Sequence, residues 1–328
     1  MLKQDKKVIK WGIIGLGNIA HKFAKDLLTI PDAELYAVAS RTQEKADDFA
    51  NTYQAKKAYA SYEDLANDSN IDAVYIATPH VFHKENTIMC LQKGIAVLCE
   101  KPFAMNANEV EDMITCAKEN NTLLMEALWT AFLPHYQFVL NEIKNETHGK
   151  LLNLKADFGF SRPFDESKRL FGKNLGGGSL LDIGIYPIFV ALSTLGIPEH
   201  INADATFFEN EVDASCTMTF NYKNGVEAQL KSSIKEVLPT EAIFTFEDAS
   251  IKINTMFHQP STVTITKNGV EETKDFGYTT IGYNFETIHF NDLIKSGKTE
   301  SDIMTFDFSR KLIALLDEVS NIIGLKYS

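Results

Sequence analysis

Cysteine is scarce in this sequence, and its pattern argues against two kinds of site. The 328 residues include four cysteines, each inside an apolar segment and none in a Cys-x-x-Cys spacing. Such cysteines are typical of buried free thiols in a reducing compartment, so we expect neither a zinc site nor a disulfide. The histidines also lack metal-ligand spacing, and no metal site is predicted. The cysteines are Cys90, Cys99, Cys116 and Cys216.

Positive charge is also in short supply. The chain has 32 Lys and Arg residues against 44 Asp and Glu residues, which gives a net charge of −12. No basic stripe is present to neutralise phosphates, so neither a nucleic acid nor an anionic membrane surface is a suitable partner. We therefore expect the partner to be a small molecule.

Long apolar runs are not evident in the sequence either. No run is expected to approach the ~20 residues that a helix needs to cross a bilayer. Residues 1–7 are charged, and strand-like residues follow them instead of the apolar core of a signal peptide. Together with the free cysteines, this pattern predicts a cytoplasmic protein.

The patterns that are present predict two domains. With 328 residues and 45% hydrophobic composition, the chain is able to form two cores. Up to residue 127, buried-strand patterns alternate with helical patterns, which is typical of a doubly wound α/β domain with a parallel sheet. From residue 128, apolar residues recur at every second position, and Asn224-Gly225 predicts a hairpin. We predict a Rossmann domain over 1–127 and an α+β domain over 128–328, with a largely antiparallel open sheet, for substrate binding and oligomerisation.

A glycine motif near the N-terminus predicts a dinucleotide site. A strand-like run leads directly into Gly15-x-Gly17-x-x-Ala20, and a helical pattern follows. Gly15 permits a tight turn, Gly17 lets a pyrophosphate approach the backbone, and Ala20 lets the helix pack closely on the strand. Glycine turns also occur without a ligand, but the strand and helix around this one favour dinucleotide binding. The predicted contacts are Gly15, Leu16, Gly17, Asn18 and Ile19.

The end of the second strand favours NADP(H) over NAD(H). A Rossmann fold reads the adenosine ribose there, and an acidic residue would accept hydrogen bonds from a 2′-hydroxyl. This chain has Ser40-Arg41 instead. A hydroxyl beside a guanidinium suits a 2′-phosphate, although Arg41 also fits an ordinary solvated start of the next helix.

Two later strand ends carry further candidates. Thr78 and Pro79 follow a buried strand and are predicted to flank the nicotinamide ribose. His80 is able to reach the same site. His83 is a cofactor candidate as well, but capping or packing of the next helix is a stronger interpretation.

The other strand end is Glu100-Lys101-Pro102. A lysine at this position is close to the nicotinamide, where its ammonium is able to bind a substrate hydroxyl or a developing alkoxide. Glu100 and Lys101 are therefore also cofactor-site candidates. A surface salt bridge at a strand end is the plainer alternative.

A glycine run in the second half precedes two polar candidates. Gly176-Gly177-Gly178 leaves the backbone free to approach a ligand, and a helical pattern follows. Asp182 and Tyr186 are four residues apart, so a helix projects them from the same face. Both side chains are thus predicted to point into one cleft, with helix capping and packing as the alternative.

These motifs together resemble one known family. The combination is similar to the Gfo/Idh/MocA oxidoreductases, and within them to the branch of the dimeric dihydrodiol dehydrogenases and NADP-dependent D-xylose dehydrogenases. The similarity covers nearly the whole chain. The motifs are Gly15-x-Gly17-x-x-Ala20, Thr78-Pro79, Glu100-Lys101-Pro102 and Met125-Glu126-Ala127-Leu128-Trp129.

The resemblance implies a reversible hydride transfer on a carbinol or carbonyl carbon of a sugar, polyol or cyclic diol. In many relatives a histidine that acts as general acid and base stands at the position of Tyr186. A phenol has an unperturbed pKa near ~10, so Lys101 is expected to favour its ionised form, while Asp182 orients the substrate or Tyr186. The family also implies a homodimer or homotetramer formed through the C-terminal sheet.

Substrate contacts are expected from the residues around the cleft. Trp129, Arg162 and Phe164 are the first candidates, and an interdomain core is the alternative role for aromatic residues at such places. Further candidates of the same kind are Phe132, His135 and Phe171.

Two other functions remain open at this point. An NAD-dependent dehydrogenase of an inositol-type substrate is one, although Ser40-Arg41 and Tyr186 count against it. A non-catalytic nucleotide-sensing regulator with the same fold is the other, but such a protein has no need of Lys101, Asp182 and Tyr186 together.

Overall fold

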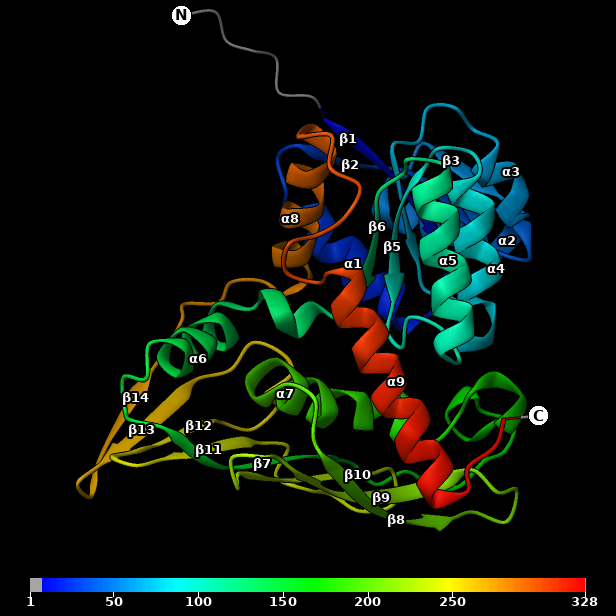
Figure 1. Cartoon of the computed structure of the whole chain (residues 1–328). Coiled ribbons are helices and arrows are strands. Elements are labelled where there is room, and N and C mark those ends of the chain that lie inside the picture. The colour runs from blue at the N-terminus through cyan, green and yellow to red at the C-terminus, as the bar shows by residue number, and fades with distance from the viewer. Residues whose placement is uncertain (1–7, 328) are drawn as a thin grey trace, which may run out of the picture. The chain divides into compact units, whose positions relative to one another are not determined.

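The computed structural model describes residues 8–327, which form two compact units (Figure 1). The first unit comprises the described residues up to Trp129 together with Thr279–Ser309. The second comprises Thr130–Tyr278 and the described residues from Arg310 onward. The expectation about a signal peptide concerns residues 1–7, which lie outside the described part.

The first unit is built on a six-stranded parallel sheet with the strand order β3-β2-β1-β4-β5-β6. Its central strands are runs of apolar residues buried on both faces, as a parallel sheet covered by helices requires. The order reverses beside β1, and ligands of open α/β sheets bind at such reversals. The predicted doubly wound fold is confirmed. The strands are β1 (Ile9–Ile14), β2 (Ala33–Ala39), β3 (Lys57–Tyr59), β4 (Ala73–Ile76), β5 (Ala96–Glu100) and β6 (Leu124–Ala127); the helices between them are α1 (Asn18–Leu27), α2 (Gln43–Tyr53), α3 (Tyr62–Ala66), α4 (His83–Leu91) and α5 (Ala107–Glu119).

Helix α8 (Tyr283–Lys295) also belongs to the first unit, although it lies far along the sequence. The buried carboxylate of Asp26 in α1 accepts hydrogen bonds from three main-chain N–H groups at the start of α8, at 2.7 to 3.1 Å. The indole Nε1 of Trp11 donates to Asn291 Oδ1 at 3.0 Å. The structure therefore differs from the predicted division, because residues 279–309 pack with the first unit while the sequence-based boundary assigned all of 128–328 to the second.

The second unit contains an eight-stranded open sheet with the order β14-β13-β12-β11-β7-β10-β9-β8. All of these neighbouring pairs are antiparallel except β7 and β10, so the predicted, largely antiparallel sheet is confirmed. Asn268 and Gly269 both have positive φ, 53° and 78°, and close a tight hairpin. The strands are β7 (Leu151–Gly159), β8 (His200–Phe207), β9 (Asp213–Asn221), β10 (Glu227–Ser233), β11 (Ala242–Phe246), β12 (Ser250–Ile253), β13 (Val263–Lys267) and β14 (Val270–Lys274).

Helices cover one face of this second sheet. Helices α6 (Pro134–Lys144) and α7 (Ile185–Leu195) pack against its strands (Figure 1). One π-helical turn (Leu180–Gly184) leads directly into α7. The last helix, α9 (Phe306–Ile323), begins in the first unit and continues in the second.

The sequence analysis expected no apolar run long enough to cross a bilayer, but one helical segment meets that criterion. The helical segment Lys173–Leu195 has a mean hydropathy of 1.6 in its most apolar window, which is enough in length and composition for a membrane span. However, 89% of that window is buried inside the structure. Such burial is typical of a core helix. The four cysteines are buried free thiols, as expected.

Candidate functional site

The glycine motif forms a tight turn between β1 and α1. Gly15 has a φ of +89°, which only glycine adopts readily, and a Cβ there would lie 2.7 Å from backbone atoms of Ala77 and Thr78. The sequence thus needs glycine at this position, because the chain turns while it touches the end of β4.

Helix α1 leaves its N-terminus open to a ligand. Gly17 is the N-cap, no side chain of the described residues caps the helix, and its first turn contains no acidic residue. A Cβ on Gly17 would meet no atom of residues 8–327 within 4 Å, so these residues leave the space beside this backbone free. Uncapped N–H groups facing free space fit the pyrophosphate of a dinucleotide.

Ser40 and Arg41 follow β2, as the sequence indicated. The side chain of Ser40 is buried, whereas Arg41 is exposed. Among residues 8–327, no carboxylate pairs with the Arg41 guanidinium. Its charge is therefore available for an anionic group at the end of β2.

The segment after β4 is tied to the segment after β5 by His83. The imidazole is fully buried, with Nε2 2.9 Å from the Thr78 carbonyl oxygen and Nδ1 2.9 Å from the Pro102 carbonyl oxygen. This geometry makes His83 a link between the two candidate strand ends. His80 is also buried, and its ring centre lies 5.7 Å from that of His83.

Lys101 is held through its main chain by the preceding residue. The N–H of Lys101 donates to Glu100 Oε2 at 3.1 Å, and the hydroxyl of Tyr75 donates to Glu100 Oε1. Glu100 is 8% exposed, whereas Lys101 is half-buried. The carboxylate of Glu100 therefore fixes the backbone from which the Lys101 side chain extends.

The glycine run before α7 serves packing within the protein, which is a different reason from the expected freedom to approach a ligand. A Cβ on Gly177 would lie 2.7 Å from the carbonyl oxygen of Leu170. A Cβ on Gly178 would lie 2.0 Å from Asp213 Oδ1 and 3.2 Å from the Tyr327 hydroxyl. Protein atoms thus fill the space in which a side chain at these two glycines would lie.

Asp182 and Tyr186 project from adjoining turns of one helix but have different neighbours. Asp182 lies in the π-helical turn, a feature that occurs often at functional sites, and its Oδ1 is 2.7 Å from Arg169 Nη2. Tyr186 is 5% exposed, and its ring packs beside Phe158 and His258 with centre distances of 5.6 and 5.0 Å.

Arg169 and His258 are two neighbours of the candidate site that the sequence did not reveal. His258 is 7% exposed and stacks on Phe158 at 4.2 Å, while its carbonyl oxygen accepts from Thr130 Oγ1 at 2.7 Å. Both residues lie in segments without a recognisable motif. Only their contacts with Asp182 and Tyr186 in the folded chain identify them, and spacing in the sequence gives no indication of either residue.

The expected substrate contacts lie in different environments. Trp129 is buried and stacks on Tyr283 at 4.3 Å. Arg162 is exposed above the ring of Phe160, at 5.7 Å, and Phe164 is 41% exposed and stacks on Phe208 at 4.8 Å.

The remaining three aromatic candidates are buried. His135 is 0% exposed, with Nε2 3.0 Å from the Phe257 carbonyl oxygen and Nδ1 2.5 Å from the Tyr278 hydroxyl. Burial lowers its pKa to about 4, so the imidazole stays neutral. Phe132 and Phe171 are 7% and 2% exposed. His135 therefore lies in the core of the second unit.

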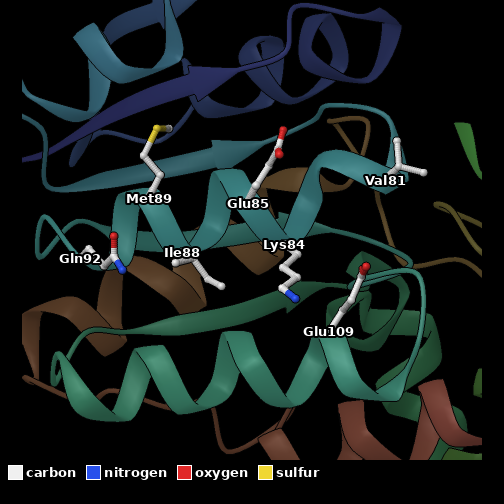
Figure 2. A pocket seen from close by; sticks show the side chains of 7 residues that line it. All are labelled: Val81, Lys84, Glu85, Ile88, Met89, Gln92 and Glu109. Atoms are coloured by element: carbon white, nitrogen blue, oxygen red, sulfur yellow. The ribbon is translucent and has the colours of Figure 1, made fainter.

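A separate pocket of about 500 Å³ lies between α4 and α5 (Figure 2). Lys84 and Ile88 point from α4 toward α5, and Glu109 points back (Figure 2). The Lys84 ammonium is paired with Asp112 at 2.6 Å. No predicted site residue lines this pocket, whose walls are Val81, Lys84, Glu85, Ile88, Met89, Gln92 and Glu109.

Asp213 holds the start of the helix that carries Asp182 and Tyr186. Its carboxyl group is fully buried, and Oδ2 accepts from Ser179 Oγ and from the Leu180 N–H, both at 2.7 Å. Burial raises its pKa from 3.8 to about 7, although these hydrogen bonds oppose the shift.

This pKa predicts a pH-dependent stability. The folded protein keeps the Asp213 proton up to about pH 7, whereas the unfolded chain loses it near pH 4, so stability should fall over this range as pH rises. Asp213→Asn retains an oxygen acceptor without a titratable proton. We expect its free energy of unfolding, measured by urea titration, to gain on the order of 2 kcal/mol over the wild type between pH 4 and pH 7. Parallel pH curves for the two proteins would contradict the assignment.

Comparison with known proteins agrees with this geometry. Residues 9–128 match the model of an oxidoreductase family with an NAD-binding Rossmann fold, and residues 136–252 match the GFO/IDH/MocA C-terminal domain. A trans-1,2-dihydrobenzene-1,2-diol dehydrogenase of Xenopus tropicalis is 35% identical over 97% of this chain and 99% of its own length. A scyllo-inositol 2-dehydrogenase (NADP(+)) of Bacillus subtilis is 34% identical, with 98% of each chain covered.

A solved structure supports the same relationship. The 3-ketoreductase of Actinomadura kijaniata, in complex with NADP and TDP-benzene, has a TM-score of 0.87 and 25% identity, and covers 96% of this chain and 98% of that one. The match includes both sheets, and two long relatives exceed 30% identity over nearly their full length. The chain therefore belongs to the Gfo/Idh/MocA family of NAD(P)-dependent oxidoreductases.

Proposed function

We propose that this protein is an NADP(H)-dependent dehydrogenase or reductase of a sugar, polyol or cyclic diol. The observation that carries the proposal is the open N-terminus of α1 beside Gly17, followed at the end of β2 by Ser40 and by Arg41, which pairs with no carboxylate of residues 8–327. The first unit would bind the dinucleotide and the second the substrate. When bound, the nicotinamide supplies or accepts the hydride.

The cofactor would be held by residues at the strand ends of the first unit. Main-chain N–H groups at Gly17 and Asn18 suit the pyrophosphate, with Gly15, Leu16 and Ile19 around it. Thr78, Pro79 and His80 would flank the ribose next to the nicotinamide. His83 and Glu100 are proposed to support the cofactor site indirectly, because their hydrogen bonds fix the main-chain segments that carry Thr78 and Lys101.

Cofactor preference is the first property to test. We expect Arg41→Ala to weaken NADPH binding by about 10- to 100-fold, because it removes charge-assisted hydrogen bonds to the 2′-phosphate. NADH affinity should change by less than about 3-fold, since NADH has no such phosphate. The measurement is cofactor fluorescence during titration of each protein with NADPH and then with NADH.

Lys45→Ala is the matched control for Arg41→Ala. It also removes a positive charge from the exposed start of α2, and it should affect NADPH affinity much less than Arg41→Ala. Equal affinities of the wild type for NADPH and NADH would contradict the preference and favour an NAD-dependent enzyme.

Three side chains are proposed to carry the chemistry. Tyr186 would exchange the proton of the substrate hydroxyl, Lys101 would bind the same oxygen and favour the phenolate, and Asp182 would orient the substrate or Tyr186. The pair with Arg169 supports an ionised Asp182. We propose that Trp129, Arg162 and Phe164 contact the substrate.

The substrate class follows from the relatives. They are named for a cyclic dihydrodiol and for an inositol, and both compounds have neighbouring hydroxyl groups on a ring. Hydrogen bonds from several side chains distinguish such neighbouring hydroxyls. We therefore propose a vicinal diol, either cyclic or within a sugar, as the substrate.

The proposed assembly is a homodimer or homotetramer formed through the second sheet, in the cytoplasm. Buried side chains of β7 and β9 alternate with more exposed ones, so one face is left outside the helix layer. Light scattering of the purified protein should give a mass of two or four chains. A mass of one chain over the micromolar range would contradict this assembly.

A further inference from the structure

One buried carboxyl group in the first unit has no hydrogen-bond partner within residues 8–327. Glu286 lies in the first turn of α8 with 0% exposure, and neither of its carboxyl oxygens is bonded. A buried unpaired charge is very costly, so such a group favours its neutral form. Burial, together with the charges of Glu100 and Asp26, raises the pKa of Glu286 well above its usual value. Glu286 is therefore a neutral acid within the core.

Tyr75 is a second buried polar residue of the first unit, and it contacts Glu100 at the end of β5. It stands in β4 with 0% exposure, and its ring stacks on Phe23 with a centre distance of 3.8 Å and an angle of 5°. Burial, and then the charge of Glu100, raises the pKa of the Tyr75 hydroxyl well above its usual value, and Glu286 adds to that effect. The hydroxyl thus stays protonated and donates to Glu100 Oε1.

Glu100 is hydrogen-bonded to both Tyr75 and Lys101. Its Oε1 accepts from Tyr75, and its Oε2 accepts from the Lys101 N–H at 3.1 Å. A carboxylate held by donors on both oxygens has little freedom to rotate. The position of the Lys101 backbone is therefore coupled to the side chain of Tyr75.

A third buried acid, Glu126, interacts electrostatically with Glu100 and Lys101. Glu126 in β6 accepts from Ser309 Oγ at 2.6 Å and from the Phe103 N–H at 3.1 Å. Burial, with a smaller contribution from the charge of Glu100, raises its pKa to about 7, although the two hydrogen bonds and the charge of Lys101 oppose the shift. Buried carboxyl groups that repel one another do not all ionise together. Glu286 and Glu126 thus both favour their neutral forms, whereas Glu100 accepts hydrogen bonds on both of its oxygens.

We propose that Tyr75 is a positioning residue that acts on Lys101 through the carboxylate of Glu100. The Tyr75 hydroxyl fixes the orientation of this carboxylate, and the carboxylate fixes the main chain from which the Lys101 side chain extends. The inference rests on the proposed function, because Lys101 is the group through which it reaches the reaction.

Tyr75→Phe tests the proposal against a matched control. Tyr136→Phe removes another fully buried hydroxyl, which lies 2.5 Å from Ser193 Oγ in the second unit. Both variants should lose about 1 kcal/mol of unfolding free energy. Only Tyr75→Phe should lower kcat, by about 10-fold, with the dissociation constant of NADPH changed by less than about 2-fold. Equal kcat values for the two variants would overturn the inference.

Different results would contradict the proposed function and the role of Tyr75. Wild-type protein that binds NADPH but oxidises or reduces none of the proposed substrates would contradict the proposed function, and with it the role of Tyr75. Wild-type turnover together with an unaffected Tyr75→Phe would contradict only the further inference.

Discussion

A Tyr186→Phe variant is expected to lose about 10²- to 10⁴-fold in kcat, which is the usual cost of removing a positioned proton donor and acceptor. The phenylalanine ring retains the contacts with Phe158 and His258, so the loss should come from the hydroxyl alone. Affinity for NADPH should stay within about 2-fold, because the proposed cofactor residues belong to the other unit. The measurement is steady-state kinetics with NADP(H), combined with a fluorescence titration of the cofactor.

Two further variants make this result specific. Tyr222 is another buried tyrosine of the second unit, and its hydroxyl has no hydrogen-bond partner among the described residues. Tyr222→Phe should therefore leave kcat unchanged. Tyr186→His should retain more activity than Tyr186→Phe, because an imidazole also exchanges protons. If Tyr186→Phe turns over as fast as the wild type, then another group is the acid and base.

Lys101→Met should lower kcat by about 10²- to 10³-fold, because it removes the cation proposed to stabilise the developing alkoxide and the phenolate. The methionine side chain has a similar length, and the main-chain hydrogen bond to Glu100 remains. Binding of NADPH should change by less than about 3-fold, since the pyrophosphate and ribose contacts lie elsewhere.

Lys93→Met is the control for loss of an exposed positive charge from the same unit. It should leave both kcat and NADPH affinity unchanged. Unaltered turnover in Lys101→Met would remove Lys101 from the mechanism and would favour the interpretation of a surface lysine at a strand end.

The sequence predicted those parts of the fold that depend on local pattern. Gly15 marked the tight turn, and the structure requires glycine there because its φ is positive and β4 lies close by. Asn224-Gly225 marked the hairpin between β9 and β10, where Gly225 has a φ of 81°. Apolar runs of four to seven residues gave the parallel strands, since strands buried on both faces have no polar alternation.

Contacts between distant segments could not be predicted in this way. No motif indicates that Asp26 caps α8, and that contact is one reason why residues 279–309 pack with the first unit. The neighbours of the candidate catalytic groups were missed for the same reason. Arg169 pairs with Asp182 and His258 packs beside Tyr186, but neither lies in a recognisable pattern. The glycines at 177 and 178 were recognised, but their close contacts with Leu170 and Asp213 became visible only in the folded chain.

The most direct test of the account is the rate of nicotinamide reduction when the purified protein is mixed with NADP⁺ and a panel of cyclic diols, inositols and aldoses. We predict oxidation of at least one vicinal diol of the panel, faster with NADP⁺ than with NAD⁺, and a loss of about 10²-fold or more in Tyr186→Phe. Cofactor binding without reduction by any member of the panel, or equal rates in the wild type and Tyr186→Phe, would contradict it.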